Sequence, residues 1–254
     1  MMQNVPTLPK LQTSPTLRVK AVAGAVVLAG LLIASVFSIR FALADATAAN
    51  VDTAFTTAYV DAYRGGAVIK LSDQARWLDE IKHANALAPA NGAHHELAFQ
   101  IHGTSLSLME KLEVAQIIDQ IKSAARDAQN ALVQRPMSPN AWANLALAES
   151  WLMLPGTLSL GFSKALENAI RFGPWEREVS MVVVDLGFAT WDVATPAARQ
   201  ATEATMLRLG LRYPEEVITA AEKRGKLALP CGNTRWQKHK KCQDLSTSAA
   251  VLAT

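Results

Sequence analysis

The sequence feature that most constrains this chain is an uninterrupted apolar run near the N-terminus. Residues 21–39 read AVAGAVVLAGLLIASVFSI and contain no charged side chain. In a helix with a rise of about 1.5 Å per residue, this run covers roughly 28 Å, close to the ~30 Å hydrocarbon core of a bilayer. It therefore predicts a transmembrane helix, which we assign to residues 21–44.

The charges that flank this run predict its orientation. Lys10, Arg18 and Lys20 precede it, and the first acidic residue of the chain is Asp45. Cytoplasmic flanks of transmembrane helices carry an excess of Lys and Arg, so we expect residues 1–20 in the cytoplasm and everything after Arg40 across the membrane. The prediction is a single-pass protein of a bacterial inner membrane with a periplasmic domain.

A cleaved signal peptide is the alternative interpretation of the same segment. Ala42, Leu43 and Ala44 have the small-x-small form of a cleavage site. The apolar run is longer than the usual core of a signal peptide, and Arg40 interrupts its approach to that site, so an uncleaved anchor is favoured. The remaining part is exported in either case. A buried core helix is disfavoured, because no other segment is so uniformly apolar.

Hydrophobic periodicity after the anchor predicts an all-α domain over residues 45–228, followed by a basic, cysteine-containing tail at 229–254. Sparse glycine and tyrosine favour helices over a β-sandwich. Gly65-Gly66 predicts a helix end, and Ser138-Pro139 and Thr195-Pro196 predict helix starts. Predicted helices cover residues 45–63, 71–87, 94–109, 112–132, 139–153, 158–172, a segment opened by Pro174, 196–211 and 214–225.

The spacing of helix-ending prolines predicts a repeat. Pro89, Pro136, Pro174 and Pro214 follow one another at intervals of 47, 38 and 40 residues. Such a period is typical of stacked helix hairpins, and we predict a tetratricopeptide-like array, with an irregular helical bundle as the alternative. The residues that match the tetratricopeptide pattern are Trp142, Leu145, Ala146, Phe162 and Ala165.

Helical spacing also predicts which side chains face inward. Trp142 shares a stripe with Leu145, Ala146 and Leu152, which we expect in the core. The opposite side of the same helix would line a partner-binding groove. That side carries Asn140, Ala143, Leu147, Ser150 and Trp151. In the helix from Pro196, a second apolar stripe contains Ala197, Ala201, Ala204, Leu207 and Leu211.

Two cysteines, Cys231 and Cys242, are the complete set. In an exported, oxidising setting they predict a disulfide. A metal site with His239 would lack a fourth ligand, and free thiols are the other alternative. Residues 222–244 also carry seven Lys or Arg against two acids. This charge predicts binding to anionic headgroups or an acidic polysaccharide, or else a solvated tail.

Motifs for catalysis are absent from the sequence. There is no P-loop, GxGxxG or GxSxG pattern. His83, His94, His95 and His102 are the best candidates for a metal site, but we favour the interpretation that they are solvated or capping residues. Glu149 faces the apolar side of its helix and needs a partner, for which Arg171 and Arg177 are the candidates. The formal charge of +3 does not indicate a nucleic-acid partner. We expect no enzymatic activity, cofactor or metal.

The segment RPMSPNAWANLALAESWL, then FGPWEREV, Trp191 and Arg199, resembles VpsP-type polysaccharide biosynthesis proteins. The resemblance covers residues 135–199 and implies a non-enzymatic accessory protein of exopolysaccharide assembly. Implied partners are a polymerase, a ligase or an export component, docked in the periplasm. A periplasmic glycan-modifying enzyme and a general envelope scaffold are the alternatives.

The membrane prediction is tested by topology and mass. A reporter that is active only in the periplasm should be active when fused after Thr254, because the flanking charges keep residues 1–20 in the cytoplasm. Mass spectrometry of the membrane fraction should find the full-length chain. Recovery of a soluble form that begins at Asp45 would instead establish a cleaved signal peptide.

Overall fold

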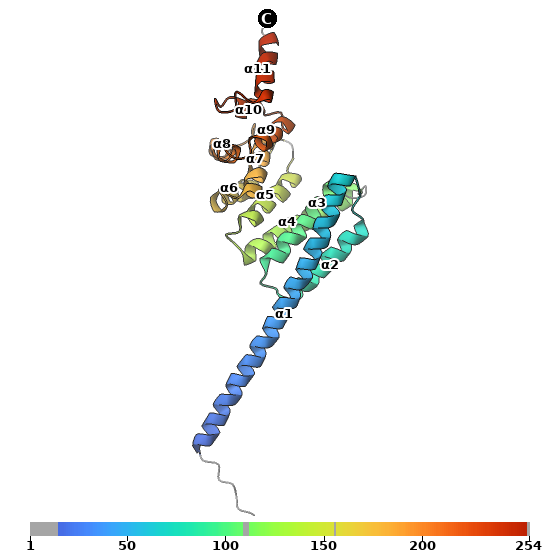
Figure 1. Cartoon of the computed structure of the whole chain (residues 1–254), viewed down its shortest axis with the longest axis vertical. Helices are drawn as coiled ribbons and strands as arrows, with labels where there is room; N and C mark the ends of the chain where they lie inside the picture. The colour runs from blue at the N-terminus through green and yellow to red at the C-terminus, as the bar shows by residue number, and fades with distance from the viewer. Residues whose placement is uncertain (1–14, 109–111, 155, 253–254) are drawn as a thin grey trace, which may run out of the picture.

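The computed structural model describes residues 15–108, 112–154 and 156–252. Within these ranges, all the secondary-structure elements are helices. The all-α prediction is therefore confirmed for this part of the chain (Figure 1). The helices are α1 (Pro15–Gly65), α2 (Leu71–Leu87), α3 (Gly92–Leu108), α4 (Val114–Gln134), α5 (Pro139–Leu152), α6 (Leu160–Phe172), α7 (Arg177–Ala189), α8 (Pro196–Gly210), α9 (Pro214–Lys223), α10 (Ala228–Cys231) and α11 (Lys240–Leu252).

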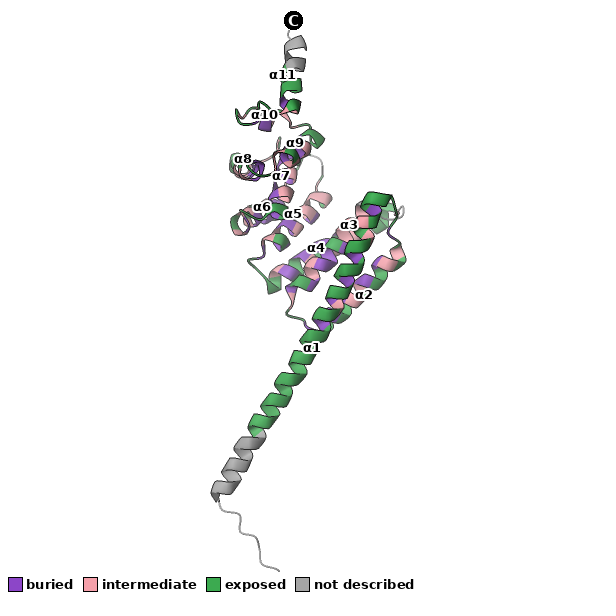
Figure 2. Cartoon of the chain, in the orientation of Figure 1, coloured by how far each residue is buried: buried purple, intermediate pink, exposed green. Residues whose placement is uncertain are grey.

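Helix α1 joins the predicted membrane segment to the first predicted helix of the exported domain without a break. Residues 26–43 are exposed, whereas Ala44 is fully buried against α2. Figure 2 shows this exposed half of α1 projecting away from the other helices. It is long and apolar enough to cross a membrane by length and composition. The helix ends at Gly65, where Gly66 adopts a positive φ of 68° and donates its N–H to the Ala62 carbonyl.

The buried side chains form successive clusters along the chain. The first joins α1, α2 and α3 around Trp77 and Ile81. The second joins α3 to α7 around Phe162 and Leu166, and the third joins α7, α8 and α9 to the C-terminal segment around Phe188. Each helix contacts its neighbour in sequence, and α1, α3, α5, α7 and α9 also contact one another in that order. The core is therefore extended along the molecule.

The helix boundaries follow local sequence signals in most places. Ser138 caps α5 by accepting a hydrogen bond from the Ala141 N–H at 3.2 Å, and Thr195 caps α8 through the Ala198 N–H at the same distance. Both predicted starts are confirmed. Pro174 does not open α7 as predicted, because it lies in the preceding turn and the helix begins at Arg177.

The buried face of α8 differs from the predicted apolar stripe. Ala197, Leu207 and Leu211 are exposed, and the buried side instead carries Thr202, Thr205, Met206 and Leu209. The reason is a close crossing with α7, where a Cβ at Gly187 would lie only 2.3 Å from the Thr202 methyl carbon. The Thr205 hydroxyl is satisfied because it donates to the Ala201 carbonyl at 2.9 Å. Buried threonines thus replace the aliphatic residues that periodicity favoured.

A polar junction ties α1 to α3. Asp45 accepts a hydrogen bond from Asn91 Nδ2 at 2.9 Å and lies 3.3 Å from Nε2 of the buried His94. Nearby, the Arg40 guanidinium donates to the Ala86 carbonyl at 3.2 Å. Burial lowers the pKa of His94 below its ordinary value of 6.5, although its hydrogen bond to Asp45 acts in the opposite direction.

This lowered pKa predicts a pH-dependent stability. The unfolded chain takes up a proton at His94 before the folded protein does as the pH falls. The stabilisation is therefore present above the ordinary pKa of 6.5 and is lost as the pH falls through the lowered value. We expect the Tm to fall from about pH 7.5 to about pH 5, the range in which histidine titrates. His94→Gln should flatten this dependence, whereas the exposed His83→Gln should not. Equal slopes in wild type and His94→Gln would contradict the assignment.

Candidate functional site: a groove along α5, α7 and α9

Two adjoining hollows form a groove along α5, α7 and α9, which we call the α5–α7–α9 groove. One hollow, of about 360 Å³, lies between α5 and α7, and the other, of about 740 Å³, lies among all three helices. They adjoin because Leu147, Leu186 and Arg224 line both. These volumes fall within the roughly 300–1,000 Å³ of ligand-sized clefts.

The larger hollow has an apolar floor and a charged rim. Its floor consists of Leu147, Met181, Val182, Leu186 and Ala220. Leu186 and Ala220 belong to the second and third core clusters, and the other three side chains pack against these clusters, so the floor is the outer side of the core. A bound segment would therefore bury apolar surface on contact with the floor.

Most of the charges on the rim are already paired within the protein. Arg224 donates to both carboxylate oxygens of Asp185, at 2.9 and 2.5 Å, and these hydrogen bonds raise the pKa of Arg224. Arg177 donates to Glu216 at 2.5 Å, which likewise raises the pKa of Arg177. Glu215 lies 2.9 Å from Nε2 of His239. Three carboxylates at this rim thus each have a cationic or imidazole partner, and Lys223 is the remaining charge.

The structure brings together three of the five residues that the sequence assigns to partner binding. Leu147, Ser150 and Trp151 line the smaller hollow. Ala143 was assigned wrongly, because it is only 2% exposed and belongs to the second core cluster. Asn140 is exposed in the first turn of α5 but does not line the groove. Ala143 is buried because α5 packs against α4, α6 and α7, so less of its surface is free than in a helix with one inward face.

Trp151 is a packing residue as well as a lining residue. Its ring stacks on Phe99 of α3, with the ring centroids 6.0 Å apart and the planes 3° from parallel. Trp151 therefore lines the groove as predicted, but α3 also packs against its ring, which the prediction did not include. Sequence spacing within α5 contains no information about this contact.

Trp142 and Leu152 of α5 are less buried than their predicted core positions require. Trp142 is half-buried against the second core cluster, and its indole N–H donates to the Pro136 carbonyl at 2.8 Å. Leu152 was expected in the same stripe but is 45% exposed. The buried residues of α5 are thus Ala141, Ala143, Leu145, Ala146 and Ala148, together with part of the Trp142 ring.

Glu149 has a partner other than those expected. Its carboxylate accepts a hydrogen bond from the Ser159 hydroxyl at 3.0 Å, at the start of α6. Arg171 lies over the ring of Phe172, and Arg177 pairs with Glu216 and Glu178. A hydrogen bond from a serine hydroxyl, and not an ion pair with either arginine, thus provides the partner of this half-buried acid.

The histidines of α3 form a polar network with α4. Asp127 lies 3.0 Å from Nδ1 of His95 and 3.5 Å from Nε2 of His102. His102 also contacts Gln120 at 2.5 Å. Burial acts to raise the pKa of Asp127, but hydrogen bonds to His102 and His95 outweigh it and hold that pKa below 3.8. These two histidines are therefore structural and half-buried. Among the described residues, no group of three or more His, Cys, Asp or Glu is arranged to hold a metal ion.

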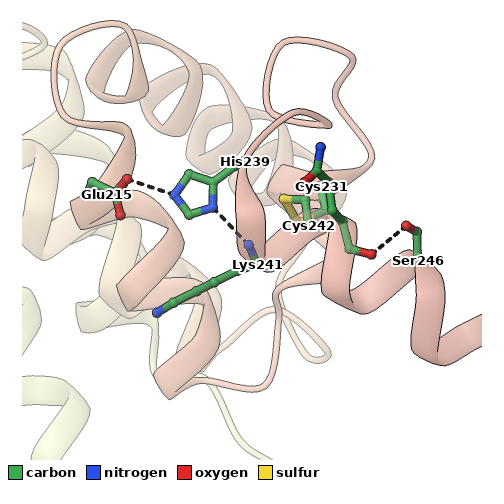
Figure 3. Close-up of a disulfide and its surroundings, with 7 residues drawn as sticks. Glu215, Cys231, His239, Lys241, Cys242 and Ser246 are labelled. Atoms are coloured by element: carbon green, nitrogen blue, oxygen red, sulfur yellow. Dashed lines mark hydrogen bonds and ion pairs between the residues drawn. A yellow bond between two sulfur atoms is a disulfide. The ribbon is translucent and has the colours of Figure 1, made fainter.

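Cys231 and Cys242 form a disulfide that joins α10 to α11 (Figure 3). The same figure shows His239 pointing away from the sulfurs toward Glu215, so this structure does not assemble the alternative metal site. Three of the basic residues in this region also have acidic partners. These pairs are Arg224 with Asp185, Lys226 with Asp192, and Lys241 with Glu222.

The basic tail lies far from the predicted membrane segment. Figure 1 shows α11 at the end of the molecule opposite the projecting half of α1. This placement argues against binding of the tail to headgroups of the membrane that α1 would span, because electrostatic attraction to a charged surface falls off within about a Debye length, roughly 8–10 Å.

No protein-family model, curated protein or solved structure matches this chain.

The role of Trp151 is tested by truncation. Trp151→Ala removes the ring that stacks on Phe99 and should lower the free energy of unfolding by about 2–4 kcal/mol, as truncations of buried aromatic residues do. Trp175→Ala is the matched control. Its ring is 79% exposed, so the change should stay within about 0.5 kcal/mol. A wild-type melting curve for Trp151→Ala would contradict the packing role.

Proposed function

We propose that this chain is a membrane-anchored, non-enzymatic scaffold of bacterial exopolysaccharide biosynthesis or export. Helix α1 would cross the inner membrane with its N-terminus in the cytoplasm, and the helical domain would stand in the periplasm. The observation that carries the proposal is the apolar-floored α5–α7–α9 groove, which lies on a domain continuous with a membrane-spanning candidate.

The occupant that fits this groove best is an amphipathic helix of a partner protein. The floor is apolar, whereas the rim carries both signs of charge in pairs that are already satisfied. A helix would bury its apolar face on this floor and keep its polar face in water, as in other helix-in-groove complexes. The candidate partners are a polysaccharide polymerase, a ligase or an export component.

A tetratricopeptide-like array is the architecture that we propose for the docking domain. Its support is the order of contacts, in which the odd-numbered helices from α1 to α9 follow one another and α6 contacts α8. Phe162 and Ala165, at the predicted repeat positions, are both buried in the second core cluster. In such arrays the first helices of successive hairpins line a continuous surface, and here α5, α7 and α9 would be those helices.

Docking is favoured over glycan modification because the carboxylates Asp185 and Glu216 at the groove are already paired with arginines. General acid–base cleavage of a glycosidic bond needs two carboxyl groups that face each other across a substrate. Asp185 and Glu216 are instead each bound to an arginine at the rim. The link to exopolysaccharide rests on the resemblance of residues 135–199 and separates this proposal from that of a general envelope scaffold.

The proposal is tested by filling the groove. Thr219 is half-buried and lines the larger hollow, so Thr219→Trp should block it without removing a core side chain. We expect exopolysaccharide output to fall by about tenfold, the effect of losing roughly 1.4 kcal/mol of docking free energy. Output would be measured as secreted polymer per cell, with the membrane abundance of the variant checked by immunoblot.

The matched control is Gln200→Trp, which places the same bulky ring at an exposed site on α8. This variant should leave output unchanged. Normal output from Thr219→Trp at normal abundance would show that the groove does not dock the partner. Unchanged output after deletion of the gene would overturn the polysaccharide role itself.

A further inference from the structure

A second concave site lies where two inter-helix turns meet. The α6–α7 turn contributes Pro174 and Trp175, and the α8–α9 turn contributes Arg212 and Tyr213. Together with residues of α7 and α8, these turns enclose a hollow of about 330 Å³, which we call the Trp175 pocket. It shares no lining residue with the α5–α7–α9 groove. Its size is at the lower end of ligand clefts, roughly 300 Å³, and suits one or two small rings.

The composition of this pocket is arginine-rich and aromatic. Arg177, Arg208 and Arg212 line it together with Trp175 and Tyr213, and none of its lining residues is acidic. Two of the arginines lie beside the aromatic rings. The Arg208 guanidinium carbon lies 5.8 Å from the Trp175 ring centroid, and that of Arg177 lies 5.0 Å from the Tyr213 centroid.

The positive charge of the pocket is only partly compensated. Glu216 and Glu178 pair with Arg177. Within the part of the chain that the structure describes, neither Arg208 nor Arg212 has an acidic partner within ion-pair distance. Arg208 donates through Nε to the Pro174 carbonyl at 3.3 Å and through Nη2 to the Thr205 hydroxyl at 2.9 Å. These two neutral acceptors hold the guanidinium in place and leave its charge uncompensated.

Trp175 supplies an apolar surface next to these charges. Its ring is 79% exposed, although tryptophan normally buries most of its large apolar area. It is not needed for the core, because it belongs to none of the buried clusters. A large exposed ring held at a tight turn beside two uncompensated arginines resembles a binding platform more than a packing element.

From this juxtaposition we infer that the Trp175 pocket binds an acidic saccharide, with a carboxylate on Arg208 and Arg212 and the apolar face of the sugar ring on Trp175. A bare anion would use the arginines and leave the indole uncovered. A neutral sugar would use the indole and leave the charges unpaired. A uronate unit has both a carboxylate, which arginine binds with charge-assisted hydrogen bonds, and a face of C–H groups that can pack on an aromatic ring.

The choice of a saccharide over other carboxylate-bearing rings rests on the proposed role in exopolysaccharide assembly. On this basis, the polymer that the scaffold handles contains uronic acid. The pocket would hold one or two units of the chain while the groove holds the partner protein, since the two sites have separate linings.

The inference is tested by direct binding to the full-length chain in lipid nanodiscs. Isothermal titration with trigalacturonate should give saturable binding. The corresponding neutral trisaccharide and sodium sulfate should each bind at least about tenfold more weakly, because each lacks one of the two contacts, worth roughly 1.4 kcal/mol or more. Equal binding of sulfate would reduce the pocket to a simple anion site, and equal binding of the neutral sugar would remove the role of the arginines. Either result would overturn the inference.

Two variants locate the binding, and one controls for charge. Arg212→Gln and Trp175→Ala should each weaken trigalacturonate binding by about tenfold without changing the Tm, because both side chains are exposed. Arg126→Gln removes the same charge from an exposed site on α4 and should have no effect. Wild-type affinity in both pocket variants, or no binding by the wild type, would overturn the assignment.

Failure of this inference and failure of the proposed function are separable. Thr219→Trp fills the groove and should retain trigalacturonate binding while exopolysaccharide output falls. If Thr219→Trp lowers output but neither the wild type nor any variant binds trigalacturonate, the docking role stands and only the pocket assignment is overturned. Uronate binding that depends on Trp175, in a strain whose output is indifferent to the gene, would support the pocket and overturn the polysaccharide role.

Discussion

The packing of α1 against α2 and α3 is the contact on which the rest of the arrangement depends. Ala44, Ala48, Val51 and Phe55 lie along one side of α1 at spacings of four, three and four residues, and all are buried. The same helix continues through residues 26–43 with every side chain exposed. The exposed half is long and apolar enough to cross a membrane, whereas the buried half packs into the domain. Because no loop separates the two halves, the orientation of the domain is coupled to that of the apolar segment.

Beyond α1, stability is distributed along the chain. Each core cluster is shared by adjacent helices, so a local change mainly affects its neighbours, as in repeat proteins. The C-terminal segment contributes to the third of these clusters. Trp236 is buried in the third cluster, close against Gly210, where a Cβ would meet the indole ring. The Cys231–Cys242 disulfide closes the loop that carries this tryptophan and could stabilise it by roughly 2–3 kcal/mol.

The two candidate sites use different parts of the same hairpins. The groove follows the sides of α5, α7 and α9, whereas the Trp175 pocket lies at the turns before α7 and α9. Arg177 connects them, because it lines the pocket and binds Glu216 at the groove.

The sequence by itself determined the features that depend on neighbouring residues. The apolar run, the caps at Ser138 and Thr195, the stop at Gly65-Gly66 and the cysteine pair are all local, and each is found where it was expected. Tertiary structure decided which helix faces are covered. It buried Ala143, placed Phe99 over Trp151, and turned the threonines of α8 inward against Gly187. It also brought Asp127 to the histidines of α3 and Arg208 to Trp175, across 25 or more residues. Periodicity within one helix cannot predict these pairs, because they depend on how close the next helix can approach.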